Sequence, residues 1–154
     1  MARGAVSAIC IAPSAGAPMH FVERVEAIAG EGLAGDRYAR GEGSFNKGLQ
    51  GNRQVTLINT FFVEKSGFNF LETRRNIVVR GIELMDQIGH EFCIDDVVLH
   101  GIKYCDPCTR PSALSGNPLS FRDTFYDRGG LVAKIVRGGF LEIGSSVVPR
   151  TKNY

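Results

Sequence analysis

The sequence predicts a mainly β protein built as a β-rich barrel. Short runs with period-two alternation of branched or aromatic side chains recur along the whole chain. Glycine occupies 19 of the 154 positions, which fits the sharp corners and bulges of a barrel. Only a few short segments have the composition of a helix. Strands therefore do not alternate with helices, as they would in a parallel, doubly wound sheet.

Length and charge favour a small globular protein. The 154 residues are expected to form one domain, residues 1–154. A net charge of +2 is too small to indicate nucleic acid or a membrane as a partner, so any electrostatic function must come from local clusters of arginine. Arg3 and the apolar run Ala5–Ala12 weakly resemble a signal peptide, but the run is short and is interrupted by Ser7. We therefore expect a cytoplasmic protein with reduced thiols.

The strands are expected where apolar alternation coincides with β-branched or aromatic residues. An acidic turn at Asp95 and Asp96 should join two of them into a hairpin. In chain order the expected strands are Ala5–Ala12, Phe21–Ile28, Gln54–Ile58, Arg74–Arg80, Phe92–Ile94, Val97–Tyr104, Leu131–Arg137 and Ser145–Val148.

The remaining segments are expected to be short helices and loops. Thr60–Lys65 should be a helix with Asn59 as its N-cap, and Ser120 should cap a second helix over Ser120–Asp127. A turn or short helix is expected around Leu84. Two further stretches are rich in glycine or proline. Ala29–Gly51 should be a long loop, of the kind that is functional or mobile, and Pro111–Leu119 should be an irregular connection.

The stretch Val97–Arg110 carries the strongest chemical signal. Its alternating strand ends in Cys105-Asp106-Pro107-Cys108, where proline cannot continue a strand ladder. The strand should therefore deliver two thiols to a turn. A working thiol must be accessible and ionised; Arg110 favours ionisation, whereas Asp106 opposes it. Cys108 is the expected functional thiol of this pair.

The chain resembles the MOSC domain, named after the C-terminal domain of molybdenum cofactor sulfurase. The matching motifs occur in family order over about residues 5–149, and each is short. A departure is Gly144-Ser145, where the family often has Gly-Asp. The motifs are Gly32–Arg37, Arg53–Ile58, Arg75–Val79, Gly81–Leu84, Gly89–Phe92, Cys105–Cys108 and Gly129–Ala133.

The resemblance implies a mixed β-barrel with two or three short peripheral helices. It also implies a molybdenum-cofactor-associated sulfur carrier or cofactor-binding protein, in which Cys108 carries a persulfide or ligates molybdenum. Its partners would be the molybdenum cofactor (molybdopterin), or a sulfur donor of the cysteine desulfurase type, and a reductase. The family is further associated with sulfurtransfer, N-hydroxyl reduction and pyridoxal phosphate binding. Whether this chain is a catalyst or a carrier stays open.

Arginines recur in these motifs, and guanidinium groups bind phosphate in a bidentate manner. A phosphorylated pterin would therefore suit a cleft containing them; the alternative is a set of solvated strand-end charges. Asp36 and Asn76 have a second interpretation as structural groups that fasten a loop and a strand end. The candidate cofactor-binding residues are Arg37, Arg53, Arg75, Asn76 and Arg110.

Two other functions remain open. Cys105 and Cys108 superficially match a thioredoxin-type dithiol, but that motif begins a long helix, which Pro111, Gly116 and Pro118 disfavour. A zinc site would use Cys105, Cys108 and His100, with Cys93 as a further ligand. Only one Cys-x-x-Cys pair is present, whereas a structural zinc site needs four ligands.

Overall fold

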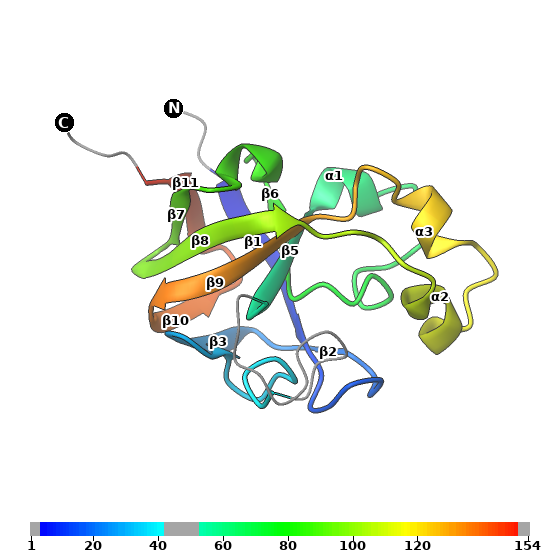
Figure 1. The fold of residues 1–154 in the computed structure, drawn as a ribbon, viewed down its shortest axis with the longest axis horizontal. Coiled ribbons are helices and arrows are strands. Elements are labelled where there is room, and N and C mark those ends of the chain that lie inside the picture. The colour runs from blue at the N-terminus through cyan, green and yellow to red at the C-terminus, as the bar shows by residue number, and fades with distance from the viewer. Residues whose placement is uncertain (1–3, 42–52, 151–154) are drawn as a thin grey trace.

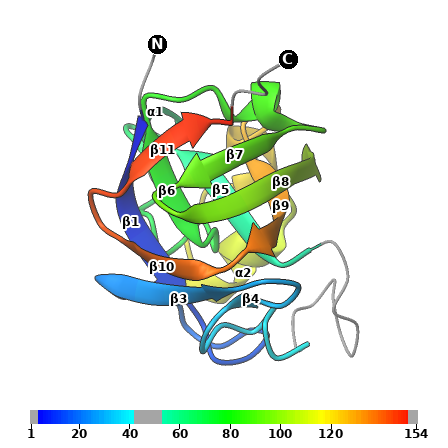
Figure 2. The same cartoon turned by 90° about the vertical axis from the view of Figure 1, so that its left-hand side faces the viewer.

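The computed structural model describes residues 4–41 and 53–150, and within them the chain forms a closed mixed β-barrel (Figures 1 and 2). Its strands run in the order β11-β7-β8-β9-β5-β6-β1, and pairing of β1 with β11 closes the barrel. Neighbours are antiparallel except β5 and β6, which are parallel. The barrel strands are β1 (Gly4–Ile11), β5 (Val55–Asn59), β6 (Ile77–Arg80), β7 (Glu91–Ile94), β8 (Val97–Tyr104), β9 (Leu131–Arg137) and β11 (Ser146–Pro149). The expected mixed barrel is confirmed.

A second sheet packs beside the barrel and contains elements that the sequence pattern did not predict. It has the order β10-β3-β4, from Gly139–Glu142, Arg24–Ile28 and Gly32–Leu33. Gly139 and the three residues after it pair with β3 as a strand. The expected strand Phe21–Ile28 is in fact two strands, because β2 (His20–Phe21) pairs with β1 and not with the second sheet. Within the expected loop Ala29–Gly51, Gly32–Leu33 is the strand β4, and residues 42–51 lie outside the described range.

The barrel interior is filled by alternate side chains of its strands. Leu57, Ile77, Leu99 and Leu131 are fully buried there. Val55–Ile58 is buried on both faces, because a second apolar cluster covers the outside of β5 and β6. This cluster is aromatic, with the rings of Phe121 and Phe125 stacked at 4.5 Å. Two covered faces explain why these central strands have continuous apolar runs.

The helices are short and gather on one side of the barrel (Figure 1): α1 (Thr60–Val63), α2 (Arg110–Ser115) and α3 (Phe121–Thr124). The expected irregular structure over Pro111–Leu119 was wrong for residues 111–115, which are helical, and holds for residues 116–119. Proline is tolerated in the first helical turn, where its missing N–H has no intrahelical acceptor. Ser120 caps α3 as expected, by accepting a hydrogen bond from the Asp123 amide. Asn59 precedes α1 but instead donates its side-chain amide to the Ile82 carbonyl.

The expected turn around Leu84 is the 3₁₀ helix η1 (Leu84–Gln87). Within the described segments, no helix has the length and apolar character that crossing a membrane requires.

Candidate anion-binding site

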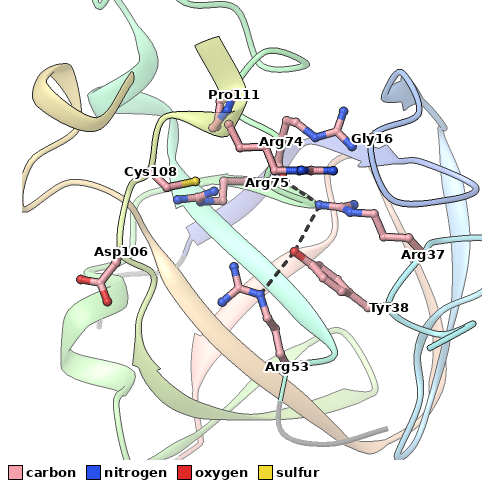
Figure 3. A pocket seen from close by; sticks show the side chains of 10 residues that line it. Gly16, Arg37, Tyr38, Arg53, Arg74, Arg75, Asp106, Cys108 and Pro111 are labelled. Atoms are coloured by element: carbon pink, nitrogen blue, oxygen red, sulfur yellow. Dashed lines mark hydrogen bonds between the residues drawn. The ribbon is translucent and has the colours of Figure 1, made fainter. Parts of the chain in front are cut away.

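A pocket lies where five segments meet: the loop between β1 and β2, the chain after β4, the residues preceding β5, those preceding β6, and the chain that runs from the turn after β8 into α2 (Figure 3). Its cavity volume is about 40 Å³, which suits a small anion. Five described arginines line it beside one carboxylate, that of Asp106. The full lining is Gly16, Arg37, Tyr38, Arg53, Arg74, Arg75, Asp106, Cys108, Arg110 and Pro111.

Buried Asp36 fixes the segment that follows β4. Its carboxylate accepts hydrogen bonds from the Ala12 amide at 3.0 Å and the Tyr38 amide at 3.2 Å, and it forms an ion pair with Arg37 at 3.0 Å. The same Arg37 guanidinium donates to the carbonyl of Arg74 at 3.1 Å. Asp36 therefore has the structural role that was one of its two interpretations, and it holds Arg37 against the chain that leads into β6.

Arg74 reaches the pocket from an unusual backbone conformation. Its φ of 59° lies in the left-handed region, which non-glycine residues rarely adopt. One guanidinium nitrogen donates to the Ala17 carbonyl at 2.8 Å. Burial, followed by the positive charges of Arg37 and Arg110, lowers the pKa of Arg74 to about 10. The pocket thus concentrates positive charge, because five arginines line it beside the single carboxylate of Asp106.

Arg75 is held on both sides by the protein. Its Nε donates to the Gly129 carbonyl at 2.6 Å, and its guanidinium carbon lies 5.3 Å from the centre of the Phe121 ring. Gly129 is required at this position, because a Cβ there would collide with the Cys105 carbonyl. Arg75 therefore links the aromatic cluster, the glycine turn before β9 and the pocket.

Arg74 and Arg75 each retain a buried nitrogen with no hydrogen-bond partner. The atoms are Nη2 in both residues, and no partner for either is found within the described part of the chain. The two residues are only 9% and 5% exposed. Leaving a buried charged donor unsatisfied is costly, and native proteins rarely do so. An anion with several acceptor oxygens in this pocket would satisfy both donors.

Arg53 connects the pocket to the buried thiol of Cys105. Its Nη2 donates to the Cys105 sulfur at 3.5 Å, and its Nε donates to the Tyr38 hydroxyl at 3.4 Å. Burial acts to lower the pKa of Arg53, but the adjacent Tyr38 and Cys105 outweigh it and raise that pKa. Tyr38 also accepts a hydrogen bond from Arg37 at 3.2 Å, so one hydroxyl joins two arginines.

The two thiols of the turn lie in different environments. Cys105 is fully buried, whereas Cys108 is half-buried and lines the pocket. Figure 3 shows the Cys108 sulfur directed toward the space occupied by the Arg74 and Arg75 side chains, while the Asp106 carboxylate points away from it. The Cys108 sulfur thus faces the arginines, and the Asp106 carboxylate is turned outward.

The pocket contains most of the residues expected from the sequence. Arg37, Arg53, Arg75, Arg110 and Cys108 line it together. Asn76 does not. Its side chain is fully buried and has three partners, because it accepts from the amide and the hydroxyl of Thr56 and donates to the Cys10 carbonyl. It joins β5, β6 and β1, which is the structural interpretation.

Sequence reasoning missed Arg74 and Tyr38. Arg74 forms a doublet with Arg75 in the sequence, and this doublet was a usable signal. Adjacent strand residues point to opposite faces, however, and a period-two pattern would place only one of them in the pocket. The left-handed backbone at Arg74 removes that constraint. Tyr38 follows Arg37 directly and gave no separate signal.

The structure does not assemble the alternative zinc site. Among the described residues there is no cluster of three or more His, Cys, Asp or Glu side chains able to hold a metal ion. His100 lies within β8, where it pairs with Glu91 of β7 and Lys134 of β9. All four cysteines are free thiols. The helix after Cys108 is only six residues long, in contrast to the long helix of a thioredoxin-type dithiol.

The fold and the pocket together define a small mixed-barrel protein with a thiol beside an arginine cluster. Solved structures share this fold. The YuaD protein from Bacillus subtilis superimposes with a TM-score of 0.80 at 15% identity, over 97% of both chains. YiiM from Escherichia coli gives a TM-score of 0.66 at 11% identity, over 97% of this chain and 71% of YiiM. YiiM from Geobacillus stearothermophilus gives a TM-score of 0.65 at 11% identity, over 96% of this chain and 75% of that YiiM chain.

No protein-family profile matches the sequence, and no curated protein is significantly similar to it. The likeness to these structures therefore concerns the fold.

Proposed function

We propose that the protein is a MOSC-type, molybdenum-cofactor-associated protein in which Cys108 is the working thiol. The observation that carries this proposal is the pair of unsatisfied guanidinium nitrogens beside a half-buried sulfur. The shared fold of YuaD and YiiM and the motif order of the sequence support the same assignment. The protein binds an anionic ligand with arginine and presents Cys108 to its reactive part.

The residues present fit the phosphate end of molybdopterin. A phosphate offers several acceptor oxygens, and the Nη2 atoms of Arg74 and Arg75 need acceptors. Arg37 and Arg53 line the same pocket and are joined through the Tyr38 hydroxyl. These arginines would hold the phosphate, and Cys108 would be the thiolate ligand offered to the metal. When bound, the molybdenum centre supplies two-electron redox and oxygen-transfer chemistry.

Sulfur carriage needs no metal and uses the same thiol. The Cys108 thiolate attacks the outer sulfur of a donor persulfide, such as that formed on a cysteine desulfurase. A new S–S bond forms on Cys108, the donor S–S bond breaks, and the donor leaves as a thiolate. The surrounding guanidinium groups favour the anionic attacking and product sulfurs.

The test measures sulfur loading and anion binding on one set of variants. The protein is treated with a donor persulfide, and its intact mass is recorded by native mass spectrometry. The wild type should gain about 32 Da, the mass of one sulfur atom, and Cys108→Ser should not show this gain. Cys93→Ser, which alters another half-buried thiol in β7, is the matched control and should load normally.

Binding of molybdopterin, measured separately, should weaken at least tenfold in Arg75→Gln. Unchanged loading in Cys108→Ser would overturn the thiol assignment. Unchanged affinity in a folded Arg75→Gln variant would overturn the phosphate assignment.

A further inference from the structure

A second groove continues from the arginine pocket. The two share Gly16, Arg74 and Pro111, of which Figure 3 shows Arg74 and Pro111 on the same side of the arginine pocket. The groove has a cavity volume of about 350 Å³, compared with about 40 Å³ for the arginine pocket. A volume above about 300 Å³ is in the range of pockets that enclose small organic ligands. The arginine pocket alone accommodates an anionic group, and the groove adds room for a larger body.

The groove has apolar walls formed by three parts of the chain. Pro18 and Met19 come from the loop before β2, Leu71 from the segment before β6, and Leu114 from α2. Leu114 is 41% exposed although it lies at the groove. Met19 joins the two sites, because its sulfur accepts a hydrogen bond from Arg37 at 3.5 Å. Apolar surface therefore begins directly beside the charged cluster.

The groove also carries a charge of the opposite sign. Glu72 lines it, and its carboxylate accepts a hydrogen bond from the Asn69 amide at 2.9 Å and contacts the Asn117 side-chain amide at 3.4 Å. Both partners are neutral amides. These contacts therefore fix the carboxylate in place without neutralising its charge. A ligand with an anionic end is thus attracted by the arginines and repelled by Glu72, which favours the orientation that places this end in the arginine pocket.

We propose that this groove binds the body of the ligand whose anionic end lies in the arginine pocket. The ligand class is a phosphate monoester of a ring-sized, largely apolar body that carries an amino or similar N–H donor for Glu72. The proposal rests on the anion-binding part of the proposed function. It adds where the rest of the ligand lies and which residues select it: Leu114 and Leu71 for the apolar body, and Glu72 for the donor.

The first test compares inorganic phosphate, methyl phosphate and 2-naphthyl phosphate by isothermal titration calorimetry. Wild-type protein should bind naphthyl phosphate at least tenfold more tightly than methyl phosphate, because the rings bury apolar surface in the groove. Leu114→Ala should remove most of this preference and leave the affinity for inorganic phosphate unchanged. Ile143→Ala is the matched control, since Ile143 is also a half-exposed aliphatic residue, at 48% exposure, but lies outside the groove.

The second test compares 4-(aminomethyl)phenyl phosphate with 4-methylphenyl phosphate. The amino compound should bind more tightly to the wild type by about tenfold, and Glu72→Gln should abolish that difference. Equal binding of methyl and naphthyl phosphate, or a Leu114→Ala effect that is the same for all three phosphates, would overturn the groove assignment. If the wild type binds none of the phosphates, including inorganic phosphate, the proposed anion pocket itself is wrong. The two failures are therefore distinguishable.

Discussion

Replacement of Arg74 by methionine should weaken ligand binding and stabilise the free protein. Arg74 is 9% exposed, donates one hydrogen bond to the Ala17 carbonyl, and retains an unsatisfied Nη2 atom within the described residues. Methionine retains an unbranched apolar stem of similar length and removes the charge. If Arg74 served mainly to stabilise the fold, this change would lower the free energy of unfolding, whereas an arginine positioned for an anion should not have that effect.

The expected magnitude follows from the environment of the guanidinium. Burial and the charges of Arg37 and Arg110 lower the pKa of Arg74 to about 10. A fall of this size means that the charge of Arg74 destabilises the folded protein by about 3 kcal/mol. Solvent screening at the pocket edge reduces this destabilisation to about 2 kcal/mol. Loss of the hydrogen bond to Ala17 costs about 1 kcal/mol. The free energy of unfolding of the free protein should therefore rise by about 1 kcal/mol.

The pH dependence has a defined sign. Below about pH 10 Arg74 is protonated in both the folded and the unfolded protein, so the cost of its charge is fully present. Above that pH the folded protein loses the proton first, and the stability of the wild type recovers relative to the variant. The difference in unfolding free energy between Arg74→Met and the wild type should therefore be constant from neutral pH to about pH 9. It should shrink as the pH rises through 10.

The assay is urea unfolding with and without phosphate. A ligand at 100 times its dissociation constant stabilises the native state by about 2.7 kcal/mol. The wild type should show this stabilisation, and Arg74→Met should lose most of it, since one charged hydrogen bond contributes about 1.5–3 kcal/mol. Arg80→Met, at the exposed end of β6, is the control. The reasoning is refuted if Arg74→Met lowers the unfolding free energy by more than about 2 kcal/mol and retains the full effect of phosphate.

Three further predictions concern the thiols and one buried amide. Burial raises the pKa of Cys10 to about 12, so its stabilising contribution is present below the unfolded thiol pKa of about 8.5 and is lost as the pH rises toward 12. Cys10→Ala should flatten the fall of stability measured by urea unfolding between pH 8.5 and 10.5, and an unchanged slope would contradict this. Cys108 should alkylate at least a few-fold faster than buried Cys105, measured by peptide mass spectrometry at neutral pH; the reverse order would reject Cys108 as the working thiol. Asn76→Ala should lower the unfolding free energy by about 2–4 kcal/mol, because it leaves the Thr56 amide without that partner, and a loss below about 1 kcal/mol would contradict its structural role.

The barrel strands were predictable because their pattern is local. Alternation at Val97–Tyr104 and Leu131–Arg137 reproduces β8 and β9 as the structure has them. The missed elements depend on distant partners. β10 has glycine at its first position and becomes a strand through its pairing with β3, more than a hundred residues away in the sequence. α2 was missed because a proline was taken as a helix breaker at a position where the helix tolerates it.

The candidate site divides in the same way. The sequence by itself determined that one turn carries two thiols and that arginines recur at strand starts, because these are facts of residue type and spacing. Only the tertiary structure decided which of them share a pocket. Strand pairing buries Asn76 between β5 and β1, and a left-handed residue turns Arg74 inward. The unsatisfied nitrogens on which the anion proposal rests arise from packing, since whether a buried donor finds an acceptor depends on every segment folded around it.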